Sequence, residues 1–333
     1  MNDLQNKLFE TVRQRAQNPR HWIDEVAGVL HKSKYAIYKK IQGETCLSLD
    51  EVVTLAAHYG LQLDPMIRPG ATLSFEFPAD SDSYRYPRYL TDIRNELELA
   101  ISLPDAHIWH AGIDLPLLHD HLCPDIVMFK FFIRQCMVSP ESHKGRYDLA
   151  EFSKDAYLKR LLKDLLVKYY RIATTEIWNS MILDITLGQI RYALQSGMLV
   201  HPQDALTLCT ELETLVVHLE NMAECGMKHL PGENAGAEFH VFHNEIAHAI
   251  NVWLLKSERI KALYLGFSNP QFLYAQDGAA VENTERWLLK LRNNATPITC
   301  ESRKERVAFF FALQKKIVKA RAEIEAIIKM NEL

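Results

Sequence analysis

Residues 22–64 read WIDEVAGVLHKSKYAIYKKIQGETCLSLDEVVTLAAHYGLQLD, and this stretch decides the fold of the N-terminal part of the chain. Its apolar residues recur three or four positions apart in three short runs. A helix that buries one face against its neighbours has this spacing. The pattern therefore predicts three consecutive helices, over residues 24–30, 34–42 and 49–59.

Polar residues and glycines mark where these helices begin and end. Ser33 precedes the second helix and Ser48 the third, and a serine hydroxyl can accept a hydrogen bond from a free N–H group of the first turn. Glu51 stands three positions after Ser48, which is the spacing of a capping box. Gly43 and Gly60 follow the second and third helices, where the left-handed conformation of glycine ends a helix.

The first two helices have the residues that a helix-turn-helix requires. Ala27 is the small residue where the two helices would cross, and Ile37, ten positions later, is the apolar anchor of the second helix. Ile41 extends that anchor by one turn, and Leu30 covers the turn. The second helix of such a motif lies in the major groove of DNA. We therefore expect helix 34–42 to be a recognition helix.

The outward face of helix 34–42 has the composition that this role requires. Successive residues of a helix are rotated by about 100°, so Ile37 and Ile41 define the buried side. The remaining side chains are lysines, tyrosines and a glutamine, with no acid among them. Lysines pair with phosphates or guanine, and glutamine pairs with adenine. We predict that the DNA-contacting residues are Ser33, Lys34, Tyr35, Tyr38, Lys39, Lys40 and Gln42.

This stretch resembles the lambda-repressor-like (XRE-like) helix-turn-helix domains of bacterial transcription regulators. It is especially similar to a group that joins the module to a long, uncharacterised C-terminal region. The resemblance covers about 45 residues and implies a DNA-binding regulator. It rests on Ser33, Tyr38, Lys39, Lys40, Ile41, Gly43, Glu44, Leu47, Ser48 and Glu51.

The sequence departs from that group at the turn. His31 replaces the usual glycine and Lys32 replaces a usual apolar residue. Lysines also stand where such proteins often carry arginines, and lysine lacks the two-pronged geometry with which arginine reads guanine. The resemblance leaves open whether Tyr38 contacts DNA or is partly buried.

The rest of the chain is expected to form a separate region. Residues 67–85 are rich in proline and turn-forming residues, so we place a domain boundary there. We predict a helix-turn-helix DNA-binding domain over residues 1–70 and an α+β region over residues 71–333 that serves dimerisation or effector sensing. The chain is predominantly helical in its patterns, but residues 237–267 are rich in β-branched and aromatic residues. We predict that they form an antiparallel β-meander.

A C-terminal helix is expected over residues 303–330. Its apolar residues follow a heptad pattern of less than three repeats, shorter than a typical coiled coil. We expect this seam to pack on its own domain rather than on a second chain. The seam residues are Phe310, Leu313, Ile317, Ala320, Ile324 and Ile327.

Composition and charge limit the classes of function. Of the 333 residues, 48% are hydrophobic, which is enough for a packed core and argues against disorder. The net charge of −4 argues against a protein that coats nucleic acid without specificity, although residues 1–70 carry a charge of +1, nine basic against eight acidic residues. The six cysteines are scattered, with no CxxC pair. With no signal region or membrane span visible, we expect a cytoplasmic protein.

Histidines form two clusters that could bind metal. HVFHNEIAHAI, residues 240–250, resembles a zinc-protease motif, but His243 and His248 are five positions apart instead of four, and Asn244 separates His243 from Glu245. The second cluster has no further spaced pair that would complete a defined motif. It comprises His107, His110, His119 and His121, with Asp114 and Asp120. We therefore predict no metal site, and leave the role of His107–His121 open.

The predicted function is transcription regulation. The chain has no glycine-rich phosphate loop and no nucleophile elbow, so we expect neither catalysis nor a cofactor. The expected partners are double-stranded DNA, a second copy of the chain and an unknown small-molecule effector, and no membrane. Two alternatives stay open: a metal-dependent enzyme with a helix-turn-helix appendage, and a module that recognises protein.

Overall fold

The computed structural model describes residues 2–16, 18, 20–61, 63, 66, 86–138, 146–152, 154–233, 235–245, 251–268, 271–276 and 278–331. Contacts between Cα atoms divide the chain into two units, residues 1–75 and 76–333. Each unit has its own hydrophobic core. The segment 67–85, where the sequence places the domain boundary, lies outside the described residues.

The described residues of the first unit form a bundle of four main helices. Its helices are α1 (Asn2–Arg15), α2 (Trp22–Val29), α3 (Lys34–Ile41) and α4 (Leu49–Tyr59). Each helix buries one apolar stripe in a shared core, in which Val12, Val26, Ile37 and Leu55 are fully enclosed. The amphipathic spacing of these short helices therefore holds the bundle together, since helices of this length are marginal in isolation.

The second unit contains a mixed sheet of seven strands. The strands are β1 (His107–Ala111), β2 (Ala173–Trp178), β3 (Phe239–His243), β4 (Val252–Lys256), β5 (Lys261–Ser268), β6 (Gln271–Gln276) and β7 (Thr296–Pro297). They follow the order β6-β5-β4-β1-β2-β3-β7. The adjacent strands β1, β2 and β3 are parallel, and the strands on either side of these three are antiparallel to their neighbours.

The prediction of an antiparallel meander over residues 237–267 is wrong, because the sheet is mixed. The first expected strand, β3, pairs in parallel with β2, for example Glu176 opposite Val241. The second, β4, pairs with β1 and β5, so β1 and β2 lie between β3 and β4. Strand composition indicates a pleated, half-buried segment but does not identify its neighbours.

Helices make up most of the second unit. They are α6 (Tyr86–Ser102), α7 (Leu117–Asp120), α8 (Pro124–Val138), α9 (Leu149–Phe152), α10 (Ala156–Tyr170), α11 (Asp184–Gln195), α12 (Asp204–Cys225), α13 (Ala279–Asn293) and α14 (Arg303–Asn331). The described part of the chain is thus predominantly helical with one sheet.

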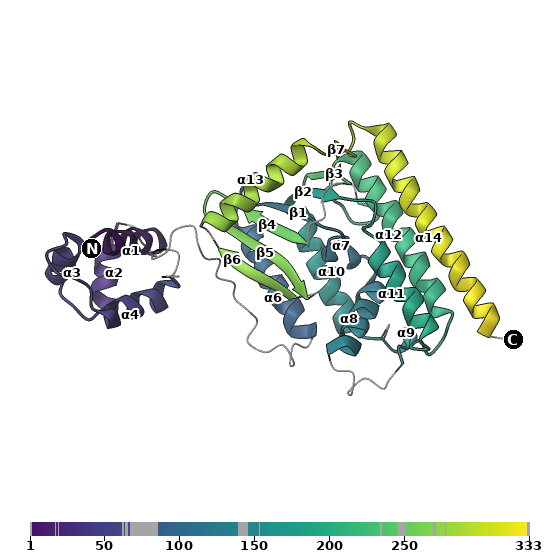
Figure 1. The fold of residues 1–333 in the computed structure, drawn as a ribbon, viewed down its shortest axis with the longest axis horizontal. Helices are drawn as coiled ribbons and strands as arrows, with labels where there is room; N and C mark the ends of the chain where they lie inside the picture. Colours follow the sequence, from purple (N-terminus) through teal and green to yellow (C-terminus); the bar gives the residue numbers. More distant parts are fainter. Residues whose placement is uncertain are drawn as a thin grey trace. The chain divides into compact units, whose positions relative to one another are not determined.

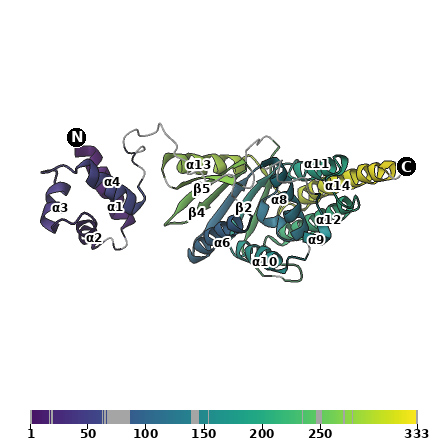
Figure 2. The same cartoon turned by 90° about the horizontal axis from the view of Figure 1, so that it is seen from below.

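Helices cover both faces of the antiparallel half of the sheet. Figure 2 shows α13 on one side of β4 and β5, and α6 on the other. Glu285 of α13 pairs with Lys261 of β5, whereas Glu96 of α6 accepts a hydrogen bond from Tyr264, three positions further along the same strand. Residues three apart on a strand point to opposite faces. The two helices therefore lie on opposite faces of the sheet.

The C-terminal helix α14 packs within its own unit. It lies along α12 (Figure 1), and the heptad residues Phe310, Leu313, Ile317 and Ile324 are buried in the core. Within the described ranges, no helix combines the length and apolar character that crossing a membrane requires.

Candidate nucleic-acid interface

Helices α2 and α3 meet at the residues that the sequence singles out. Ala27, Leu30 and Ile37 are all buried, and Ile41 is partly buried against the same core. The small side chain of Ala27 lets α3 lie close to α2. Because Ile37 is fully enclosed, it fixes which face of α3 points away from the bundle.

His31, in the turn between α2 and α3, has a backbone conformation that favours glycine. It is the one described residue other than glycine with a positive φ, 51°. The backbone N–H of His31 donates to the Gly28 carbonyl at 3.2 Å, and that of Lys32 donates to Ala27 at 3.0 Å. A left-handed conformation is costly for a residue with a Cβ, so these bonds and the packing beneath Leu30 must hold the turn in place.

The helix caps agree with the sequence. The Ser33 hydroxyl accepts a hydrogen bond from the Ala36 backbone at 3.3 Å at the start of α3. At α4, Ser48 and Glu51 form a complete capping box, with bonds of 3.2 and 2.7 Å. Gly60 ends α4 in the left-handed conformation. Local bonds therefore set the bounds of both helices.

The outward face of α3 presents most of the predicted DNA-contacting side chains to solvent. Tyr35 is 69% exposed and Tyr38 is 49% exposed, although tyrosine usually buries its ring. Lys34 and Gln42 are also exposed, and Lys39 is half-buried. Two exposed aromatic rings beside basic groups form a surface suited to the edges and backbone of a duplex.

Acids from neighbouring segments reach the lysines of this face, which inspection of α3 alone does not reveal. Lys34 pairs with Asp24 of α2. The ammonium group of Lys39 lies 3.8 Å from the carboxylate of Glu44 and 4.9 Å from the centre of the Tyr35 ring. Pairs this exposed contribute little free energy, so phosphate groups can displace them.

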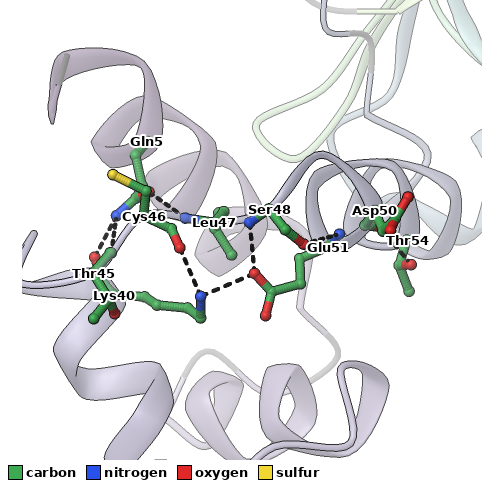
Figure 3. Close-up of polar contacts among 9 residues, drawn as sticks. All are labelled: Gln5, Lys40, Thr45, Cys46, Leu47, Ser48, Asp50, Glu51 and Thr54. Atoms are coloured by element: carbon green, nitrogen blue, oxygen red, sulfur yellow. Dashed lines mark hydrogen bonds and ion pairs between the residues drawn. The ribbon is translucent and has the colours of Figure 1, made fainter.

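The side chain of Lys40 does not lie on the outward face of α3, where the sequence pattern placed it. Its side chain is only 12% exposed, and its ammonium group donates to the Cys46 carbonyl at 2.8 Å and to the Glu51 carboxylate at 2.9 Å (Figure 3). The long lysine stem lets the charge turn back to the capping box of α4. Lys40 therefore joins α3 to α4, and we remove it from the set of expected DNA contacts.

Gln5 of α1 holds the loop between α3 and α4, a role that no local pattern signals. Its amide nitrogen donates to the carbonyls of Lys40, at 2.6 Å, and Thr45, at 3.1 Å. Its amide oxygen accepts from the Leu47 backbone at 2.8 Å (Figure 3). These partners lie 35 to 42 residues away along the chain. Gln5 satisfies three backbone groups at once and so fixes the end of α3 relative to the bundle.

The histidines of residues 107–121 do not all lie on one face of the sheet. His107 and His110 are on opposite faces of β1, as their spacing on a strand requires. His110 and His121 are fully buried, and neither of their rings has a hydrogen-bond partner among the described residues. In the same described ranges, no group of three or more histidine, cysteine or acidic side chains is placed to hold a metal ion.

His119 is instead part of a buried network around Glu176 of β2. Its Nε2 lies 3.1 Å from both carboxylate oxygens. Tyr169 donates to the same carboxylate at 2.6 Å, Trp178 at 3.0 Å and Thr174 at 3.2 Å. Burial opposes ionisation of Glu176, but the interactions with His119 outweigh it and lower the pKa of the carboxyl. The network binds the strand to α7 and α10.

The second histidine motif is only partly described. His243 Nε2 lies 2.6 Å from Glu245, whose carboxylate also accepts from the Ser180 hydroxyl at 3.2 Å. His248 lies outside the described residues. Ser180 and His243 are thus both bound to Glu245 rather than to each other. Activation of a serine requires a direct hydrogen bond from its hydroxyl to a base, and the histidine does not make that bond here.

Comparison of the chain with models of protein families, with curated proteins and with solved structures finds no match. The resemblance carried by residues 33–51 therefore stays an expectation. Function must be proposed from the geometry and chemistry of the two units.

Proposed function

We propose that this chain is a DNA-binding transcription regulator whose helix α3 enters the major groove. One observation carries the proposal: a helix anchored by the buried Ile37 exposes Tyr35 and Tyr38 beside Lys34 and Lys39. Two large aromatic side chains on a solvent-facing helix leave apolar surface uncovered unless a partner binds there. The basic groups around them favour a polyanion as that partner.

The side chains divide into two kinds of contact. Lys34 and Lys39 are suited to phosphates, which position a protein on a duplex, and the Ser33 hydroxyl lies at the start of α3, where phosphates often bind. Gln42 is suited to adenine, and the tyrosine rings are suited to thymine methyl groups and sugars. Lys40 acts indirectly in this proposal, since it holds α3 against α4.

We also propose that the regulator binds as a homodimer. One module with a few phosphate contacts binds weakly at physiological salt, and a two-fold pair would place two recognition helices about 34 Å apart on one face of DNA. The heptad residues of α14 are buried inside their own unit, so a dimer would use another surface. The second unit would hold the pair and respond to an effector.

The test measures binding of the full chain to fragmented genomic DNA by fluorescence anisotropy across a salt series. The altered protein is the double substitution Lys34→Ala/Lys39→Ala, which leaves the Lys40 contacts intact. Loss of two phosphate contacts should lower the slope of log K against log salt by about 1.8 and weaken binding at every salt concentration. Circular dichroism should show unchanged helix content.

The matched control removes two exposed lysines of the second unit, Lys163→Ala/Lys319→Ala. It makes the same change in net charge and should bind as the wild type does. Equal binding by the wild type, the control and the Lys34/Lys39 variant would contradict the proposal, and so would binding that does not depend on salt.

A protein partner for the first unit is the second candidate, because α4 also exposes apolar side chains. Leu49 is 77% exposed and Val53, one turn later, is 53% exposed. Neighbouring exposed apolar residues often mark protein contacts. The salt series discriminates between the two functions: an apolar contact would give a flat dependence, whereas phosphate contacts give a steep one.

A further inference from the structure

The second unit has a cavity of about 530 Å³ on the face of the sheet that carries α13. Side chains from β1, β2, β3, β4, β5 and the end of α13 line it. A cavity of this volume lies in the range of small-molecule sites, about 300–1,000 Å³.

The floor of the cavity is neutral and polar. The ring nitrogen Nε2 of His107 lies 2.8 Å from the hydroxyl of Thr175 on the neighbouring strand. Burial lowers the pKa of His107 to about 4. The imidazole is therefore uncharged at neutral pH, and it offers a hydrogen bond rather than a charge to whatever occupies the cavity.

The lining has three basic side chains, Lys256, Lys261 and Arg292. Lys256 and Lys261 are opposite each other on β4 and β5, and both pair with the carboxylate of Glu285, at 2.6 and 2.7 Å. The guanidinium of Arg292 lies 5.6 Å from the centre of the Trp109 ring and donates one hydrogen bond to the Asn293 side chain at 3.0 Å. Arg292 has no ion pair within the part of the chain that the structure describes.

We propose that this cavity binds a small anionic molecule through its phosphate or carboxylate groups. Arg292 is the principal contact, because its guanidinium lies over the Trp109 ring and its N–H groups other than the one bound to Asn293 can donate to an oxyanion. Lys256 and Lys261 bind the same anion from the opposite wall. His107 and Thr175 hydrogen-bond to its uncharged part.

Two exposed carboxylates that also line the cavity, Asp105 and Glu258, favour a small ligand over nucleic acid. The Asp105 carboxylate accepts a hydrogen bond from the Glu258 backbone. The two carboxylates would repel a long polyanion, whereas a small anion can contact the basic side chains of the same cavity. That the anion acts as the effector of a regulator rests on the function proposed above. Its binding to the cavity does not depend on that function.

Isothermal titration calorimetry of the full chain tests the site with two probes, inorganic pyrophosphate and citrate. We expect at least one of them to bind with a Kd below about 1 mM. Preference for pyrophosphate assigns a phosphate-bearing ligand, and preference for citrate a carboxylate-bearing one. Arg292→Met keeps most of the stem but removes the donors, and it should weaken binding by about tenfold or more. Lys261→Met, which leaves the Arg292–Trp109 stack in place, should also weaken it.

The matched control is Lys290→Met, which removes a cation from the exposed side of the same helix and should not change the affinity. Binding of neither probe, or equal affinity of the wild type and Arg292→Met, would overturn the proposal. DNA that competes with pyrophosphate through Arg292 would overturn the choice of a small ligand. Anion binding without DNA binding would support this site and contradict only the proposed regulator. DNA binding without anion binding would support the regulator and overturn this site.

Discussion

Glu51 in the first unit and Glu176 in the second are both carboxylates held by several hydrogen bonds, but they are built in different ways. Glu51 bonds the backbone of Ser48, three residues away, and the ammonium group of Lys40, eleven residues away. Glu176 is fully buried, and its partner His119 lies 57 residues away on another element. One network follows from short spacings in the sequence, and the other exists only after the sheet has formed.

This difference has an energetic consequence. The Glu51 carboxylate keeps some contact with water, so losing one partner leaves solvent to replace it. The Glu176 side chain has no contact with solvent, so removing its carboxylate leaves several buried donors without an acceptor. The first unit can therefore lose a charged surface contact at small cost in stability, whereas the second unit cannot lose its buried carboxylate. Three substitutions test this difference.

The largest effect is expected for Glu176→Gln. The amide keeps the shape but removes the charge and one acceptor, so the second unit should lose about 3–5 kcal/mol of stability. Hydrogen-exchange mass spectrometry across a urea series can follow α10 and β2 separately from the first unit. Glu238→Gln, an exposed acid just before β3, is the control and should change little. A loss for Glu176→Gln no larger than that of the control would break the contrast.

A smaller effect is expected for Lys40→Met. Methionine fills the space of the stem but leaves the Cys46 carbonyl and one bond of Glu51 unpaired, so the first unit should lose about 1–2 kcal/mol. Hydrogen exchange in peptides of α3 and α4 measures this loss of stability. Lys34→Met, on the exposed side of the same helix, should stay within about 0.5 kcal/mol. If both substitutions cost the same, Lys40 has no special place in the bundle.

The smallest effect is the acid sensitivity of the first unit. Partial burial raises the pKa of Glu51, but bonds from Ser48 and Lys40 outweigh it, and the net pKa lies below the usual value of 4.5. A depressed folded pKa gives stability that is complete above the unfolded pKa and is lost as pH falls through the folded pKa. Exchange in α4 measured between pH 7 and pH 3 should show this loss, and Glu51→Gln should reduce the slope. An unchanged slope in that variant would assign the acid sensitivity to other groups.

Two features of the first unit followed from its sequence because their causes are local. The helices at 34–41 and 49–59 begin at serine caps and end beside glycines, and each cap joins residues three positions apart. The replacement of a turn glycine by His31 identified the residue that the structure places at positive φ.

The misassigned features have non-local causes. Lys40 lies at the edge of the outward face, where a long side chain can turn either to solvent or back to the bundle, and Glu51 from another helix decides between them. Strand β3 has a strand-like composition, but its parallel partner lies 65 residues earlier in the chain, as Val241 opposite Glu176 shows. The separation of His107 from His110, in contrast, follows from the twofold period of a strand and was accessible from the sequence.

The pattern of the helices, their caps and the basic, aromatic outer face of α3 could be predicted from the sequence, since each rests on spacings of a few residues. Packing of the folded units was needed to show that Lys40 bonds α3 to α4, that Glu176 binds His119, and that Arg292, Trp109 and His107 line one cavity. Contacts of the second kind join segments far apart along the chain, and they form only when packing of the whole unit compensates the entropy of closing those loops.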